Sequence, residues 1–164
     1  MKSLHVLVRE FRTGDEPALW DVFYSSIHGL ASADYTPEQI DAWASGAPDM
    51  AKWAERMQSI APFVAEREGR IVGYGDVQAD GYIDHFYVSP SVARSGVGSA
   101  LMVRIHGTAS LRGTSSLYSN VSITARPFFE KWGFVVESPQ TVFIRGVSFT
   151  NFRMSKELAP GRVT

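Results

Sequence analysis

The order of apolar and polar residues in the first part of the chain predicts one strand followed by helices. Residues 4–11 alternate in character, which is typical of a strand, and the turn-forming residues 13–17 then start a helix that we expect to end near His28. The segment 36–39, Thr-Pro-Glu-Gln, combines a helix N-cap with a proline and an acid in the first turn. We therefore expect a second helix from this segment through Trp43.

The middle of the chain changes from helical to strand periodicity. Asp49 is suited to start a third helix, because apolar residues recur on one helical face after it until Pro62 interrupts the pattern. Three short apolar runs follow, at residues 63–66, 71–77 and 82–88, and each of the two connections contains a glycine typical of a hairpin turn. These runs predict an antiparallel meander.

The last part of the chain alternates between helix and strand patterns. Apolar residues recur every four positions from Val97, which predicts an amphipathic helix that begins directly at a glycine-containing loop. Residues 116–121 predict a strand, and residues 123–132 a helix that a glycine ends. Two further strands are expected near residues 134–136 and over residues 142–154.

The composition fits one domain over residues 1–164. Of these residues 45% are apolar and 12% aromatic, which is enough for a core. No apolar run approaches the roughly 18 residues of a membrane-spanning helix, and Lys2, Arg9 and Glu10 interrupt the N-terminal apolar stretch, unlike in a signal peptide. We therefore expect a cytoplasmic protein with no membrane partner. The lack of cysteine excludes disulfides and a thiolate nucleophile, and the histidines lack metal-ligand spacing, so we expect no metal site.

The two halves of the chain carry opposite charges. Residues 1–84 contain 14 acidic and 7 basic residues, whereas residues 85–164 contain 3 and 9, so that the net charges are −7 and +6. No acidic residue occurs from His85 to Phe129. The basic half is suited to an anionic ligand and the acidic half to a cationic one, although ordinary solvated surfaces also show such asymmetry.

The loop at residues 94–99, Arg-Ser-Gly-Val-Gly-Ser, has the features of a phosphate site. A helix start leaves backbone N–H groups unpaired, its dipole favours anions, and glycines let a phosphate approach the main chain. A nucleoside-triphosphate loop would place lysine where Ser99 stands. A dinucleotide loop would place a third glycine at Leu101 and an acid about 20 residues later, but no acid occurs before Glu130. Both of these classes are therefore disfavoured.

Over nearly its whole length the sequence resembles the GNAT superfamily of acetyltransferases. The resemblance rests on the strand 81–88 followed by Ser-Pro, on the loop and helix start 93–101, and on the late helix and strand 125–134. Residues 151–156, Asn-Phe-Arg-Met-Ser-Lys, also look like the closing strand of an uncharacterised bacterial subgroup. The resemblance implies an α/β (α+β) fold with a mixed, mostly antiparallel central sheet of about six to seven strands flanked by helices.

The resemblance also implies acetyl-CoA as the cofactor. The positions that match the family's cofactor site are Phe86, Tyr87, Val88, Arg94, Ser95, Gly96, Val97, Gly98, Ser99, Ser122 and Phe129. In the family the central strand bulges near the position of Val88 and splays from its neighbour to admit the pantetheine arm, and a backbone amide there faces the thioester carbonyl. Three slots depart from the family pattern: Ala93 replaces a frequent Gln or Arg, Ser122 a frequent Asn, and Phe129 a frequent tyrosine thought to protonate the departing thiolate.

Amine acetylation requires a group that accepts the ammonium proton at pH 7. Asp84 is the leading candidate, because it is the only acid on the strand that enters the cofactor loop and it matches the position where relatives place a Glu or His base. The alternative for this residue is an ion-paired or solvated aspartate near a turn. Tyr118 or Tyr87 could protonate the thiolate in place of the tyrosine missing at Phe129, although each is more typical of strand packing. A thiol pKa of about 8.5 also allows the thiolate to leave without a donor.

Aromatic residues are candidates for binding the acceptor. We expect Tyr24, Tyr35 and Tyr82 to line the acceptor pocket, with Trp43 and Trp53 as further candidates, although aromatic residues at helical spacing more often belong to a core. His85 should point away from the candidate base, because successive residues of a strand face opposite sides, and we interpret it as structural.

Three functions compete on these observations. The first is an N-acetyltransferase that transfers an acetyl group directly, in a ternary complex, to the primary amine of a cationic small molecule or a peptide. The second is a non-catalytic acyl-CoA-binding or sensing module, which Phe129 favours and Asp84 opposes. The third is a nucleotide- or nucleic-acid-binding domain, but the arginines are scattered and no RNA-binding motif occurs, so we expect no nucleic-acid partner. A homodimer is one candidate assembly.

Overall fold

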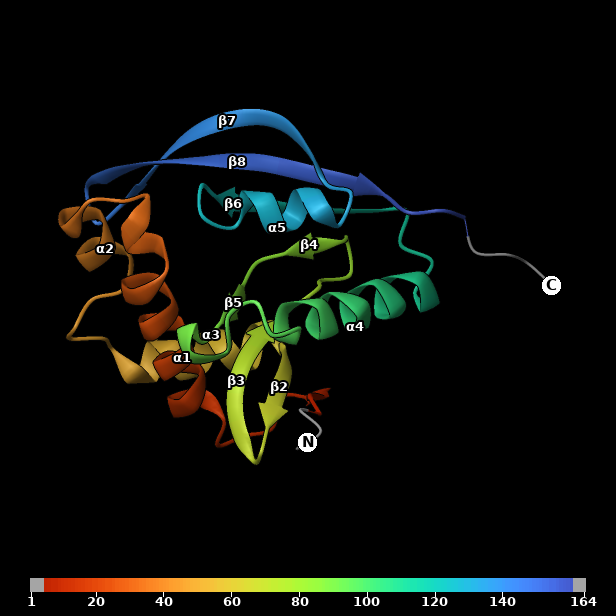
Figure 1. The fold of residues 1–164 in the computed structure, drawn as a ribbon, viewed down its shortest axis with the longest axis horizontal. Coiled ribbons are helices and arrows are strands. Elements are labelled where there is room, and N and C mark those ends of the chain that lie inside the picture. The colour runs from red at the N-terminus through yellow and green to blue at the C-terminus, as the bar shows by residue number, and fades with distance from the viewer. Residues whose placement is uncertain (1–4, 161–164) are drawn as a thin grey trace.

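Two four-stranded sheets form the framework of the molecule, and they meet where β4 of one sheet is followed in sequence by β5 of the other (Figure 1). The computed structural model describes residues 5–160. One sheet has the strand order β1-β2-β3-β5 and the other the order β4-β6-β8-β7. The elements are β1 (Leu7–Glu10), α1 (Glu16–Gly29), η1 (Ala31–Ala33), α2 (Pro37–Trp43), α3 (Met50–Ile60), β2 (Phe63–Arg67), β3 (Arg70–Gly75), β4 (Tyr82–Ile83), β5 (Phe86–Val88), η2 (Pro90–Val92), α4 (Val97–Leu111), β6 (Ser116–Ser122), α5 (Arg126–Lys131), β7 (Val135–Ile144) and β8 (Val147–Glu157).

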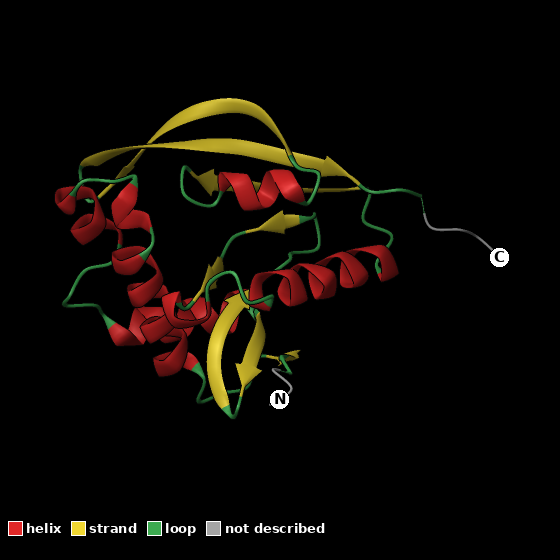
Figure 2. Cartoon of the chain, viewed as in Figure 1, coloured by secondary structure: helices red, strands yellow, loops and turns green. Residues whose placement is uncertain are grey.

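The helices between β1 and β2 form where the sequence predicts them. At the start of α2, Thr36 and Gln39 exchange hydrogen bonds between side chain and backbone in a capping box. At the start of α3, the Asp49 carboxylate accepts from two backbone amides of the first turn. Figure 2 shows these helices grouped at one end of the molecule, and α1 packs against β3 and β5. The group forms a first core around Leu19, Ile27 and Met57.

The expected antiparallel meander is present, but its third strand is divided. β2 pairs with β3, and β3 pairs with β5, both antiparallel. The short strand β4, residues 82–83, precedes β5 in the sequence but does not belong to this sheet. It pairs in parallel with β6 in the other sheet. The expected strand 82–88 therefore belongs to two sheets, and its break lies at Asp84 and His85.

Helix α4 lies across the first sheet and begins at the glycine loop, as predicted. Its buried residues include Val97, Leu101 and Ile105, which are the apolar positions that recur every four residues. They form a second core with β2, β6 and α5. The helix start is thereby fixed beside the C-terminal end of β5.

The C-terminal part differs from the expectation in two places. The segment 142–154 is not one strand, because Arg145 and Gly146 both adopt left-handed backbone angles, with φ of 50° and 77°, and turn the chain into the β7–β8 hairpin. Helix α5 starts at Arg126, later than predicted, because the Ser122 hydroxyl accepts from the Ala125 amide at 3.0 Å and holds a turn before the helix. The described residues thus form eight strands in two sheets, against the six to seven strands of a single sheet that the sequence suggested.

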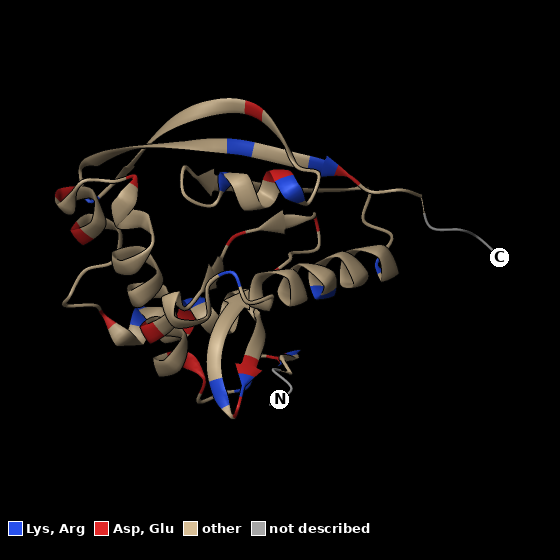
Figure 3. Cartoon of the chain, in the orientation of Figure 1, with Lys and Arg blue, Asp and Glu red and all other residues tan. Residues whose placement is uncertain are grey.

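The charged residues follow the division of the sequence. In Figure 3 acidic residues gather over the N-terminal helices and the neighbouring strands. The charged residues of α4 and of the loop before it are all basic. No helix within residues 5–160 is both long and apolar enough to span a membrane.

Candidate functional site

A pocket lies where β5 and β6 diverge, and we call it the β5–β6 pocket. The two strands belong to different sheets, since β6 pairs with the short β4 at residues 82–83, whereas β5, which follows β4 in the sequence, pairs with β3. The residues that line the pocket are Trp43, Asp84, Phe86, Tyr87, Ser119, Asn120, Val121, Ser122, Ala125 and Phe129. The list brings together one candidate base and several of the expected cofactor residues.

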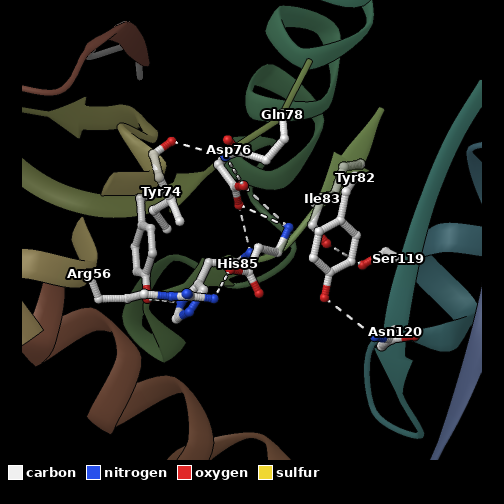
Figure 4. Close-up of polar contacts among 11 residues, drawn as sticks. Arg56, Tyr74, Asp76, Gln78, Tyr82, Ile83, His85, Ser119 and Asn120 are labelled. Carbon is white, nitrogen blue, oxygen red and sulfur yellow. Dashed lines mark hydrogen bonds and ion pairs between the residues drawn. The ribbon is translucent and has the colours of Figure 1, made fainter. Parts of the chain in front are cut away.

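Asp76, directly after β3, stabilises the strand break at residues 84–85. Its carboxylate accepts hydrogen bonds from the backbone amides of His85 at 2.6 Å and Asp84 at 3.1 Å, and from the Gln78 side chain at 2.7 Å (Figure 4). Without Asp76, these two backbone amides would need hydrogen-bond acceptors from a neighbouring strand. Burial raises the pKa of Asp76 to about 6, even though the hydrogen bonds favour its charged form.

The division of the strand leaves part of the β5 backbone facing the pocket. The backbone amide of Ser89 donates to the Val72 carbonyl, and the backbone amide of Asp76 donates to the His85 carbonyl. Every second residue of this segment therefore forms backbone hydrogen bonds with β3 or the residue that follows it. The amides of the alternate residues, Phe86 and Val88, therefore point away from β3, on the side where β5 has no partner strand among residues 5–160. Two amides are thus directed at the gap between β5 and β6.

The bulge expected near Val88 is not present. The pairing of β3 with β5 is regular over its three residue pairs, and the irregularity lies instead at Asp84 and His85, before β5 begins. The cause is the Asp76 carboxylate, which replaces a neighbouring strand as the acceptor for these amides. The splay itself agrees with the expectation.

Asp84 lies at the apex of the pocket, where the two strands separate. Its side chain is 16% exposed and pairs with Arg56 of α3. The structure therefore combines the two interpretations of Asp84, because the carboxylate both lines the pocket and belongs to an ion pair. Arg56 played no part in the sequence interpretation.

His85 points away from Asp84 into a group of aromatic rings, as its strand position predicts. Its Nδ1 lies 3.0 Å from the Tyr74 hydroxyl, and the rings of Phe23 and Trp53 lie 5.8 and 6.0 Å from the imidazole. Burial lowers the pKa of His85 to about 4, so the ring is neutral at pH 7. A neutral imidazole in this position adds no charge beside Asp84.

Tyr87 is the tyrosine that lines the pocket, whereas Phe129 brings no hydroxyl to it. The Phe129 side chain is 2% exposed and packs edge-on against Phe86 at 5.7 Å. Burial raises the pKa of Tyr87, so its phenol keeps its proton far above neutral pH. Tyr87 shares the pocket wall with Asp84.

Tyr118 and Tyr82 lie beside the pocket and not among its lining residues. Their rings stack at 5.0 Å, and the Tyr118 hydroxyl donates to the Asp80 carboxylate, which raises the pKa of the phenol. The Arg153 guanidinium lies over the Tyr118 ring, 4.1 Å from the ring centroid. Tyr82 keeps a link to the site, because its hydroxyl accepts from Asn120 at 3.3 Å.

Of the aromatic residues expected around the acceptor, Trp43 lines the pocket and Tyr35 does not. The Tyr35 hydroxyl donates to the Thr150 carbonyl at 2.7 Å and accepts from the Ile123 amide at 3.0 Å. Through these two bonds, Tyr35 joins β8 to the turn before α5. Tyr24 stacks on His28 at 4.0 Å, outside the pocket lining.

The two loop glycines have different roles. Gly96 is the N-cap of α4 with a φ of 92°, a left-handed conformation, and the space where a Cβ would stand is open. Gly98 instead makes room for Phe128, whose ring would lie 3.1 Å from an added Cβ. Gly96 therefore leaves the main chain accessible, as a phosphate site requires, while Gly98 allows close packing of α5 on α4.

The remaining loop residues expose the start of α4. Arg94 and Ser95 are exposed, with Arg94 at a φ of 62°, and Ser99 is exposed in the first turn. No side chain caps the helix. Val97 is fully buried, so only its backbone amide is available to a ligand.

Arg67 reaches this loop from the end of β2. Its guanidinium donates to the Ser95 hydroxyl at 3.0 Å and to the Ser95 carbonyl at 3.3 Å, and its Nε is buried without a hydrogen-bond partner in the described part of the chain. An unpaired buried N–H beside an uncapped helix start is suited to an anionic group. Arg67 lies in the position to supply the charge that Ala93 does not.

Three residues of the site escaped the sequence interpretation. Asp76, Arg56 and Arg67 lie in the acidic half of the chain; Arg56 and Arg67 are each 28 residues from their partners Asp84 and Ser95, and Asp76 is eight and nine residues from Asp84 and His85. The one available signal is at Asp76, an acid that directly follows a run of buried apolar residues. A charged residue at that position requires partners when buried.

Comparison with known proteins places the chain in a family. A model of the acetyltransferase (GNAT) domain matches residues 31–156. The Escherichia coli K12 protein YafP, described as an uncharacterized N-acetyltransferase, is 35% identical over 150 residues, which cover 92% of this chain and 95% of YafP. The chain belongs to the GNAT family of acetyltransferases.

Solved structures share this architecture. A GCN5-related N-acetyltransferase from Rhodopseudomonas palustris matches with a TM-score of 0.90 at 32% identity, over 96% of this chain and 99% of the other. The PaiA N-acetyltransferase of Thermoplasma acidophilum, solved in complex with coenzyme A, matches with a TM-score of 0.74 at 18% identity, over 94% and 100%. The mixed fold predicted from the sequence is confirmed.

Proposed function

We propose that this chain is an acetyl-CoA-dependent N-acetyltransferase that transfers the acetyl group directly to a primary amine in a ternary complex. The observation that carries the proposal is the position of Asp84, a carboxylate at the apex of the β5–β6 pocket beside backbone amides that no strand pairs. The structural relative PaiA was solved with coenzyme A. The family and the pocket support the same cofactor here.

The residues around the loop fit the phosphates of acetyl-CoA. The uncapped start of α4, the open space at Gly96 and the unpaired Nε of Arg67 all favour a bound anion. Arg67 and the exposed Arg94 would supply positive charge, and the amides of the first helical turn would supply donors. The chemistry that the cofactor brings is an acetyl thioester whose thiolate can leave.

The pocket residues then divide the remaining tasks. The amides of Phe86 and Val88 point into the gap, where an N–H donor polarises a carbonyl oxygen and stabilises charge that develops on it. Asp84 accepts the proton of the attacking ammonium group, directly or through water. Tyr87 lies on the same pocket wall, and its phenol can donate a hydrogen bond to the departing thiolate.

Phe129 favours a second candidate, a non-catalytic acyl-CoA-binding module. It lines the pocket where many relatives have a tyrosine, and its ring offers no proton. This candidate binds the cofactor through the same loop but releases no thiol. Tyr87 and Asp84 argue against it, since a binding module has no need of either group in the pocket.

The test combines turnover with binding. Acetyl-CoA is incubated with amino acids, polyamines, aminoglycosides and peptides, and free thiol is followed, while calorimetry measures CoA affinity. Thiol release above buffer hydrolysis that disappears in Asp84→Asn, with CoA affinity retained, supports the transferase. Cofactor binding without turnover across this panel would support the binding module.

A further inference from the structure

Asp84 shares its carboxylate with Arg56, and this pair bears on the nature of the acceptor. Arg56 lies on α3, and its guanidinium donates to the Asp84 carboxylate (Figure 4). The Asp84 side chain is 16% exposed and the Arg56 side chain 53% exposed. The carboxylate is therefore largely enclosed at the apex of the β5–β6 pocket, and the arginine reaches it from the solvent side.

A simple cationic amine fits this pair poorly. An ammonium group that approaches Asp84 competes with Arg56 for one carboxylate, and the two positive groups repel each other at contact distance. Arg56 has no other ion-pair partner in the described part of the chain, so its displacement would leave it unpaired.

An acceptor with both charges avoids this conflict. We propose that the acceptor carries a carboxylate next to its amine, as a free α-amino acid does, and that Asp84 and Arg56 bind its two ends. This inference rests on the proposed N-acetyltransferase function. The ammonium group takes the place of Arg56 on Asp84, and the acceptor's carboxylate takes the place of Asp84 on Arg56. Each of the four charges keeps a partner, and a guanidinium is well shaped to bind a carboxylate through two hydrogen bonds.

The pocket wall also indicates the side chain of such an acceptor. Trp43 and Tyr87 line the pocket next to Asp84, with their rings 6.4 Å apart and edge-on. These rings favour an apolar or aromatic side chain. A peptide is disfavoured, because its terminal carboxylate lies many bonds away from its amine and cannot reach Arg56 at the same time.

The reaction of such an acceptor balances with the groups present. The amino nitrogen forms a bond to the acetyl carbon, the carbon–sulfur bond of the thioester breaks, and the products are an N-acetyl amino acid and a free thiol. The ammonium group loses two protons. One reaches solvent through Asp84, and the other ends on the thiol.

Matched acceptors test the requirement for a carboxylate. L-Phenylalanine, L-phenylalaninamide and phenethylamine share one side chain and an amine, and only the first has a carboxylate. With the wild-type protein we expect kcat/KM for phenylalanine to exceed that for the other two by about tenfold or more, the usual weight of a charge-assisted hydrogen bond. Calorimetry on the CoA-loaded protein should show the same order of affinity, and the common L-amino acids and their amides extend the panel.

Two variants test the residue. Arg56→Gln should lower the affinity for the amino acid by about tenfold or more, and should lower the ratio of kcat/KM for phenylalanine to kcat/KM for phenethylamine by about the same factor. Lys52→Gln is the matched control, because Lys52 is an exposed cation on the same helix, one turn away, and should leave the preference intact.

The outcomes separate this inference from the proposed function. Acetylation of phenethylamine at least as well as of phenylalanine, an equal loss for both acceptors in Arg56→Gln, or no binding of any common amino acid to the CoA-loaded protein would overturn the inference while the transferase stands. Absence of both CoA binding and thiol release would remove the proposed function, and the inference with it.

Discussion

The Asp76 carboxylate accepts a 2.6 Å hydrogen bond from the backbone amide of His85, nine residues later in the chain. This bond, with the one from the Asp84 amide, divides a strand between two sheets and sets the direction of the candidate base. The buried Asp76 carboxylate thus accepts hydrogen bonds that carbonyl groups of a neighbouring strand accept elsewhere in the molecule. Its pKa of about 6 gives the arrangement a measurable pH dependence.

The stability of the fold should respond to the ionisation of Asp76. Because burial raises its pKa from 3.8 in the unfolded chain to about 6 in the fold, the protonated form is favoured by folding. The stability contribution of this group is full below pH 3.8, falls as the pH rises to 6, and stays constant above that. The difference amounts to about 3 kcal/mol.

The variant Asp76→Asn isolates this effect, since its amide oxygen can still accept from the two backbone amides. Urea unfolding of the wild type and the variant at pH 4 and pH 7 measures the free energy of unfolding of each. We expect the wild type to lose about 2 kcal/mol relative to the variant between these two pH values, because part of the contribution is already lost at pH 4. Parallel pH profiles for the two proteins would contradict the assignment.

The catalytic role of Asp84 predicts a loss of turnover without a loss of cofactor. Asp84→Asn should lower kcat by about a hundredfold or more, because general bases contribute at least this much, and should leave CoA affinity unchanged. Thiol release and calorimetry measure the two quantities. Asp41→Asn, an exposed acid on α2, is the control for the loss of one negative charge. Equal activity in the two variants would exclude Asp84 as the base.

The two tyrosines near the pocket should behave differently. Tyr87→Phe removes the hydroxyl that lines the pocket with Asp84, and we expect kcat to fall by about tenfold or more. Tyr118→Phe removes a hydroxyl that donates to Asp80, and we expect little change in kcat. Steady-state kinetics with both variants decides between them. The reverse order of effects would return the role of proton donor to Tyr118.

Arg67 should contribute to cofactor affinity. Arg67→Gln removes the guanidinium beside Ser95, and we expect the Kd for CoA to rise by about tenfold, the effect of losing charge-assisted hydrogen bonds. The salt dependence of binding should weaken at the same time. Arg70→Gln is the matched control, because Arg70 is an exposed arginine on the adjacent strand. Unchanged CoA affinity in Arg67→Gln would refute the role.

Local chemistry explains which parts of the fold the sequence could predict. The caps at Thr36 and Asp49 act on amides within three residues, so the starts of α2 and α3 can be inferred from a few letters. The start of α4 at Val97 depends in the same way on the adjacent Gly96. By contrast, the turn at Arg145 has a non-glycine residue with positive φ, which is uncommon, and the sequence pattern predicts a continuous strand over residues 142–154 across this turn.

The candidate site shows the same division at a larger scale. The glycine loop and Asp84 lie within one short segment, and family motifs point to them. Arg67 bonds to Ser95 across 28 residues, and Arg56 pairs with Asp84 across 28 residues. Such contacts depend on how the sheets and helices pack, and no periodicity in the chain encodes them. The same holds for Tyr35, whose partner Thr150 lies 115 residues away.

The divided strand also has a consequence for the order of folding. The β2–β3–β5 meander joins segments that are close in sequence, whereas β4 pairs with β6 from Tyr82 to Tyr118, across the whole of α4. Closing a long loop costs more chain entropy than forming a hairpin, so we expect this parallel pairing to follow the meander. A nascent chain would then form the loop at residues 94–99 before it forms the β5–β6 pocket, and we expect cofactor binding to begin only after β6 has been synthesised and docked.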